Sequence, residues 1–317
     1  MLHGMRPVAI ALRGCAVLIA AGVTAACTAS PSAPAAPPLA AATPAATASA
    51  AGTHSPSAAP TPASAPKPKP KPKPKPRVSI YRARTADGAL VTVAVFRGPV
   101  RFVLHNGSQD PGWAASVKGV RYGPAVGSAE RRHLLAAFNG GFRLGVGAGG
   151  YEQEGHVVSP LLSGYASLII DRSGRARIGL WGYGAPTRDE AVYSVRQNLR
   201  LLVEHGRPTP AAADPSVWGA TLGGGAYVAR SAVGEDAAGD LLYAGSMSAV
   251  PGDLAVALAR HGARTAMELD INPAWVQLDA ASRPGGPLHA ALSGQHRPAD
   301  QFLRGWTRDY FTVLANS

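Results

Sequence analysis

Cysteine is scarce in this sequence: the 317 residues contain only Cys15 and Cys27, both close to the start. The remainder of the chain therefore has no disulfide, no thiol nucleophile and no cysteine for a zinc site. The seven histidines beyond residue 77 are scattered, and neither an HExxH nor a GxSxG motif occurs. The sequence thus predicts no metal site and no cofactor.

Acidic residues are missing from the first 77 positions, which nevertheless hold eight of the 31 basic residues. The rest of the chain carries the other 23 basic residues and all 19 acidic ones, so its net positive charge is small. The formal charge of +12 is therefore concentrated at the beginning. Nucleic acid is not an expected partner, because no strongly basic surface is predicted for the folded part.

The first segment, residues 1–27, has the pattern of an export signal. Its apolar run, residues 15–26, is too short to span a bilayer and suits a signal-peptide core. The run ends in Thr24-Ala25-Ala26-Cys27, which resembles the lipobox of bacterial lipoproteins. That resemblance implies lipidation of Cys27 and an extracytoplasmic protein anchored to the membrane. Because Thr24 replaces the usual aliphatic residue, ordinary cleavage and secretion is the alternative.

Residues 28–77 form the second segment and consist almost entirely of Ala, Pro, Ser, Thr and Lys. Such a composition buries too little apolar surface to offset chain entropy, so we expect a disordered tether. Lysine and proline alternate from Lys67 to Pro76, which favours stiff polyproline II. At ~3.1 Å per residue, about 50 such residues reach on the order of 150 Å. The lysines suit contact with an anionic wall polymer or lipid head groups, or only keep a spacer soluble.

The third segment, residues 78–317, is long enough for one domain. Short apolar runs separated by glycine turns predict many strands, and only a few segments have a helical pattern. We expect strands at 91–96, 101–105, 166–171, 176–181, 199–203, 225–231, 240–245 and 265–272, and helices at 128–135 and 253–260. This predicts an α+β fold, a single domain with a curved mixed, largely antiparallel β-sheet and a few packed helices.

The segment Ala266 to Asn272 has the clearest alternation of apolar and polar residues. Met267, Leu269 and Ile271 fall on one face of the expected strand. The other face carries Glu268, Asp270 and Asn272. If a helix covers the apolar face, two carboxylates about 7 Å apart remain available for acid–base work on a glycosyl bond. A half-exposed strand with its polar face in water explains the pattern equally well.

Two further segments carry candidate binding groups. Asn139-Gly140-Gly141-Phe142 predicts a tight turn after a strand, with backbone N–H groups that suit an anion or a sugar hydroxyl. Arg230, on an expected strand, has the planar fork of donors that holds phosphate, although a surface position or an ion pair also fits.

Together and in this order, Asn139 to Phe142, Arg230 to Gly234 and the stretch from Leu254 to Asp270 resemble motifs of the phosphodiester glycosidase family. The resemblance covers residues 77–317. It implies hydrolysis of a sugar-1-phosphate diester, and it places Asn139, Arg230 and Asp270 in the substrate pocket.

The chain departs from the family pattern after Asp270. Ile271-Asn272-Pro273-Ala274 stands where family members have three glycines and a serine. The substrate therefore differs, or hydrolysis has been lost and binding kept.

Two hypotheses follow. In the first, a cell-envelope hydrolase uses Asp270, with Glu268 as partner, to cleave a sugar phosphate or cell-wall glycopolymer. Arg230 and the N–H groups of Gly140 and Gly141 hold the phosphate, while Asn139 and Asn272 contact the sugar. In the second, a non-catalytic lipoprotein binds a cell-wall polysaccharide on the same fold.

Overall fold

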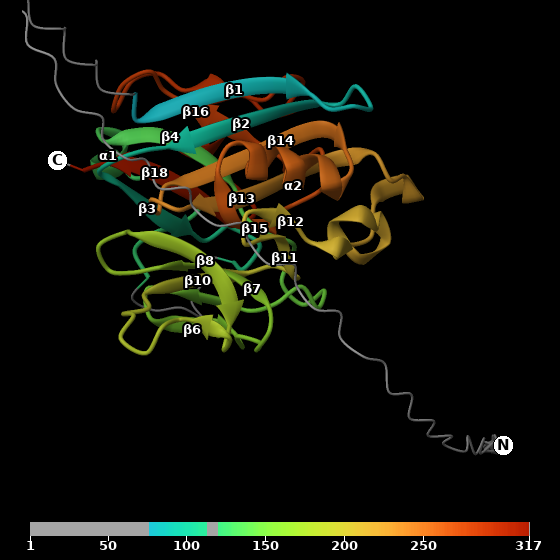
Figure 1. Ribbon diagram of the computed structural model, residues 1–317. Helices are drawn as coiled ribbons and strands as arrows, with labels where there is room; N and C mark the ends of the chain where they lie inside the picture. The colour runs from blue at the N-terminus through green and yellow to red at the C-terminus, as the bar shows by residue number, and fades with distance from the viewer. Residues whose placement is uncertain (1–75, 113–119, 317) are drawn as a thin grey trace, which may run out of the picture. The chain divides into compact units, whose positions relative to one another are not determined.

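The computed structural model describes residues 76–112 and 120–316 (Figure 1). The predicted signal segment, Cys27 and the tether up to residue 75 lie outside these residues. The described part consists mostly of antiparallel β-sheets with three α-helices, so it is richer in strand than the predicted α+β class. No helix in this part is both long enough and apolar enough to cross a membrane.

The largest sheet has seven strands in the order β1-β2-β14-β13-β15-β11-β12. All its neighbours are antiparallel. Its strands are β1 (Val78–Arg84), β2 (Leu90–Phe96), β11 (Leu201–Glu204), β12 (Arg207–Pro208), β13 (Val228–Asp236), β14 (Leu241–Ala249) and β15 (Ala263–Glu268).

Two smaller sheets complete the domain. The five-stranded sheet has the order β17-β16-β4-β18-β3, and the six-stranded sheet has the order β6-β5-β10-β7-β8-β9. The five-stranded sheet comprises β3 (Val100–His105), β4 (Leu134–Asn139), β16 (Leu278–Ala280), β17 (His289–Ala290) and β18 (Tyr310–Ala315). The six-stranded sheet comprises β5 (Tyr151–Gln153), β6 (His156–Ser159), β7 (Ala166–Ile170), β8 (Ala176–Trp181), β9 (Gly184–Ala185) and β10 (Ser194–Gln197).

Helices are short and few. The longest, α2 (Pro251–Arg260), lies against the seven-stranded sheet beside β13 and β14 (Figure 1). The other helical elements are α1 (Ser128–Arg131), α3 (Gln301–Arg304) and the 3-10 turns η1 (Pro210–Ala213), η2 (Pro215–Val217) and η3 (Leu222–Gly224).

Strand periodicity explains how the seven-stranded sheet separates two cores. Along β2, Val91, Val93 and Val95 pack with the buried face of α2, while Ala94 and Phe96 join a core shared by all three sheets. Leu254 and Leu258 of α2 are fully buried on this face. Each such leucine stabilises the fold by roughly 1.5–3 kcal/mol. Because successive side chains point to opposite faces of a strand, β2 contributes residues to both cores.

Phe138 is central to the shared core and fixes the end of β4. Its ring lies 5.8 Å from that of Phe96, 5.3 Å from that of Phe311 and 5.2 Å from that of Tyr243. Residues of the seven-stranded and five-stranded sheets thus position the turn that begins at Asn139.

Two expected elements differ in extent. The helix expected at 128–135 ends at Arg131, because Leu134 already pairs with Leu314 of β18. The strand expected to reach Asn272 ends at Glu268. Asp270 consequently lies on a connecting segment and not on a strand face.

Candidate functional site

A cavity of about 320 Å³ opens where the segments after β4 and β15 meet the segment before β18. Its volume lies within the range of ligand-binding pockets. The polar residues of its wall are Arg143, Asp270, Asn272 and Arg308. Its apolar residues include Phe142, Val146, Ala148, Leu199, Ile271 and Trp275.

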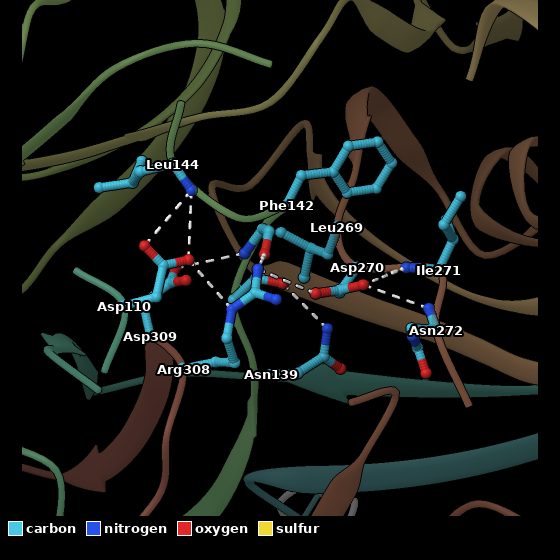
Figure 2. A network of polar contacts seen from close by, with 12 residues as sticks. Asp110, Asn139, Phe142, Leu144, Leu269, Asp270, Ile271, Asn272, Arg308 and Asp309 are labelled. Atoms are coloured by element: carbon cyan, nitrogen blue, oxygen red, sulfur yellow. Dashed lines mark hydrogen bonds and ion pairs between the residues drawn. The ribbon is translucent and has the colours of Figure 1, made fainter. Parts of the chain in front are cut away.

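Backbone hydrogen bonds hold the segment after β15 in place, so that Asp270 lies at the wall of this cavity. Ser231 N donates to Asp270 O over 3.1 Å, and Asp270 N donates to Gly140 O over 3.0 Å. The Asp270 carboxylate then accepts from the N–H groups of Ile271 and Asn272, at 2.8 and 3.2 Å. Asp270 is therefore held on both sides, and its second carboxylate oxygen faces Arg308 (Figure 2).

Arg308 is the central cation of the site. Its Nη2 lies 3.2 Å from Asp270 Oδ2, and its Nε lies 3.1 Å from Asp110 Oδ2. Nη2 also donates to Gly141 O over 3.1 Å, and the guanidinium carbon lies 5.5 Å from the Trp275 ring centroid. One guanidinium thus joins two carboxylates at the cavity (Figure 2).

The two glycines predicted to bind an anion instead accommodate a buried ion pair. Gly140 N donates to Asp309 O, and Gly141 N donates to Asp309 Oδ2 over 3.2 Å. A Cβ at Gly140 would lie 2.0 Å from Asp309 Oδ2, and one at Gly141 would lie 2.9 Å from Arg196 Cζ. Arg196 and Asp309 are paired at 2.7 Å with no appreciable exposure. These N–H groups are therefore already bonded within the protein.

Asn139 is buried behind the cavity, and its amide is fully used. Its oxygen accepts from Tyr243 OH at 2.9 Å and from Gln277 N at 3.1 Å. Its nitrogen donates to Gly140 O and to Ser231 Oγ, each over 2.9 Å. In place of the sugar contact expected from the sequence, Asn139 connects β4 to β13, β14 and β16.

Glu268 and Arg230 form a second buried pair, away from the cavity. Their 2.7 Å contact joins two side chains that are both 0% exposed. Ala266, on the same face of β15 as Glu268, packs with the core under α2, whereas Met267 and Leu269 enter the shared core. The helix therefore covers the face that carries Glu268, the opposite of the predicted arrangement. The structure does not bring Glu268 and Asp270 into one cleft.

Burial raises the pKa of both carboxylates that contact Arg308. It raises the pKa of Asp270 to about 6, while Arg308 and the two N–H donors oppose the rise and Asp309 adds to it. Burial also raises the pKa of Asp110, again opposed by Arg308. Asp270 can therefore exchange a proton near neutral pH. Among residues 76–112 and 120–316, no group of three or more His, Cys, Asp or Glu side chains is arranged to hold a metal ion.

Sequence reasoning identified Asp270 and Asn272 but missed Arg308, Asp110 and Trp275. Arg308 lies two residues before the start of β18, and Asp110 lies in an Asp-Pro-Gly turn. Neither belongs to a recognisable motif. Their contact depends on segments about 200 residues apart, which no local pattern reveals.

Comparison with known proteins finds weak structural similarity only. No protein-family model and no curated protein matches the chain. The catalytic domain of zebrafish N-acetylglucosamine-1-phosphodiester alpha-N-acetylglucosaminidase, auto-inhibited by its pro-peptide, is similar with a TM-score of 0.45 and 14% identity, over 76% of this chain and 82% of that one. A hypothetical protein from Synechocystis is similar with a TM-score of 0.48 and 13% identity, over 75% of this chain and 62% of that one.

Proposed function

We propose that this protein is a hydrolase of the cell envelope that cleaves a glycosyl phosphodiester at the cavity beside Asp270. The observation that carries the proposal is the pairing of Asp270 with Arg308 in the cavity wall, at 3.2 Å. A carboxylate of raised pKa beside a guanidinium combines the two groups that such a reaction needs, a base or nucleophile and a phosphate ligand.

The charge of the cavity wall favours an anionic substrate. Arg143 and Arg308 contribute two positive charges, and Asp270 contributes one negative charge. Arg143 is exposed, whereas the Arg308 side chain is 12% exposed and held in place. Arg308 thus takes the phosphate-binding role that the sequence assigned to Arg230, because Arg230 has no exposed surface.

In the proposed reaction, Asp270 and the two arginines act on the bond between the sugar and the phosphate. Asp270 attacks the anomeric carbon, or removes a proton from a water molecule that attacks it. The bond from that carbon to the phosphate oxygen breaks, and its electron pair leaves with the phosphate. A phosphate monoester is a weak base, so positive charge from Arg308 and Arg143 contributes more than a strong general acid. If Asp270 attacks, a water molecule then hydrolyses the glycosyl ester and restores the carboxylate. The products of either route are a free sugar and a phosphate monoester.

The apolar wall suits the rest of such a substrate. Trp275 is half-buried at the cavity and adds aromatic surface to the same wall as Arg308. Asn272 lies at the same wall, and its side chain accepts from Ala274 N over 2.9 Å, which leaves its amide N–H₂ for a hydroxyl. The predicted export signal places the enzyme among envelope polymers that contain sugar phosphates.

A non-catalytic polysaccharide-binding protein is the second candidate. Ile271 favours it, because this side chain packs with Phe142 and Ala148 where the resembling family has glycine. A bulky residue there limits how closely a substrate approaches the backbone beside Asp270.

The test is to incubate the purified protein with a panel of sugar-1-phosphate diesters and to measure released sugar. Asp270→Asn should abolish release, while Asp189→Asn, on the exposed surface, should not change it. Release that survives Asp270→Asn would remove Asp270 from the mechanism. Binding of the diesters without any release would favour the second candidate.

A further inference from the structure

The loop that carries Asp110 is fastened to the backbone around Arg308. Ser108 N donates to Trp306 O over 2.9 Å, and Asp110 N donates to Thr307 O over 3.0 Å. The approach is so close that a Cβ at Gly107 would lie 2.4 Å from the carbonyl carbon of Arg308. The position of Asp110 relative to Arg308 is therefore set by backbone contacts as well as by charge.

The Asp110 carboxylate is itself held in place. Its Oδ2 accepts from Leu144 N over 3.2 Å, and the side chain is 13% exposed. Leu144 follows Phe142 and Arg143, which form part of the cavity wall. Asp110 thus fastens one wall of the cavity and the cation of the site at the same time.

The two ends of the Arg308 guanidinium have different surroundings. Nη2 points to Asp270, and both residues line the cavity. Nε lies 3.1 Å from Asp110 Oδ2 (Figure 2), an ion pair without hydrogen-bond geometry, and Asp110 is not part of the cavity wall. An anion in the cavity can therefore compete with Asp270 for Nη2 without disturbing the contact at Nε.

We infer that Asp110 is a positioning residue that anchors Arg308 at Nε while Nη2 exchanges Asp270 for a phosphate. This inference rests on the proposed function, because it specifies how the phosphate subsite works. Anchoring keeps a flexible side chain in one rotamer, so less conformational entropy is lost when phosphate binds.

Replacement of Asp270 by phosphate at Nη2 of Arg308 also changes the pKa of Asp270. The charged groups that act on its carboxylate are Arg308, which favours ionisation, and Asp309, which opposes it. Asp110 is acted on by Arg308, Asp309 and Arg196. When Nη2 turns to phosphate, Asp270 loses its cation and gains a negative neighbour. Phosphate binding should therefore promote proton uptake by Asp270.

Measuring phosphate binding by the Asp110→Asn variant distinguishes a positioning role of Asp110 from the direct electrostatic effect of its charge. Removing a negative charge near an anion site should strengthen binding if Coulomb attraction alone decides. If Asp110 anchors Arg308, binding of inorganic phosphate measured by calorimetry should weaken about tenfold, the scale of one lost close charge pair. Asp110→Glu should restore part of the affinity, and Asp189→Asn is the matched control. Equal or tighter binding by Asp110→Asn would overturn the inference.

A second pair of measurements distinguishes this inference from the proposed function. Carboxyl carbon NMR should show the pKa of Asp270 rising when inorganic phosphate is added, and Arg308→Met should abolish phosphate binding. If the unsubstituted protein does not bind phosphate, or binds it without Arg308, the phosphate subsite fails and the inference fails with it. If binding needs Arg308 but Asp110→Asn does not weaken it, only the positioning role fails.

Discussion

The buried pair of Glu268 and Arg230 supports a quantitative prediction about stability. The substitution Glu268→Gln retains the shape of the side chain but leaves the Arg230 guanidinium without a counter-charge. Arg230 keeps only its 3.2 Å hydrogen bond from Nε to Ala249 O, and its Nη2 already has no partner in its buried position. An uncompensated buried charge costs about 3–5 kcal/mol.

This loss is large relative to the stability of a domain, which is typically 5–15 kcal/mol. For a domain of about 240 residues, each kcal/mol shifts the Tm by roughly 2–4 °C, so Glu268→Gln should lower the Tm by about 6–20 °C. Burial raises the pKa of Glu268 to about 8, opposed by Arg230, so differential scanning calorimetry at about pH 9, where Glu268 is ionised, measures the shift. Glu204→Gln, at an exposed position in β11, is the matched control and should stay within about 2 °C.

The double variant Arg230→Met with Glu268→Leu tests the reason for the loss. Apolar residues of similar volume remove both charges together, so most of the stability should return. Below its Tm, the folded Glu268→Gln protein should retain its turnover, because the carboxylate does not reach the cavity. An unchanged Tm combined with lost turnover would refute this reasoning and return Glu268 to the chemistry.

Three further predictions concern the cavity. Because catalysis needs ionised Asp270, whose pKa is about 6, kcat/KM for a diester should decrease as the pH falls below about 6. In Arg308→Met, carboxyl carbon NMR should show a higher pKa for Asp270, since the guanidinium favours ionisation. The folded pKa of Asp270, about 6, lies above its ordinary value of 3.8, so ionisation destabilises the fold. As pH rises from 4 to 7, the protein should lose about 2.4 kcal/mol relative to Asp270→Asn in urea unfolding. A constant difference across this range would contradict the assigned pKa. Gly140→Ala should lower stability by about 1–3 kcal/mol, because its Cβ would collide with Asp309, whereas Gly225→Ala, with open space, should be almost neutral.

Much of the secondary structure followed from local pattern. The strands expected at 91–96, 101–105 and 176–181 correspond to β2, β3 and β8, and the helix at 253–260 corresponds to α2. These segments combine β-branched residues or helical periodicity with glycine-bounded ends, so local preference and burial agree. At Leu134 and Leu135, local preference and burial disagreed. These residues have a helical pattern, but they belong to β4, which pairs with β18 and β16.

Sequence alone determined that the folded part has no cysteine chemistry, that most of the net positive charge precedes it, and that Asp270 and its neighbours are candidate site residues. Only the tertiary structure decided which groups meet there. Alternation along a strand shows which residues share a face, but not which face is covered. The covered face is the one that carries Glu268, which therefore forms a buried pair with Arg230. Arg308 and Asp110 reach Asp270 because the packing of the five-stranded sheet against the seven-stranded sheet brings distant loops together. That convergence arises from packing around Phe138, and no single segment of the chain contains it.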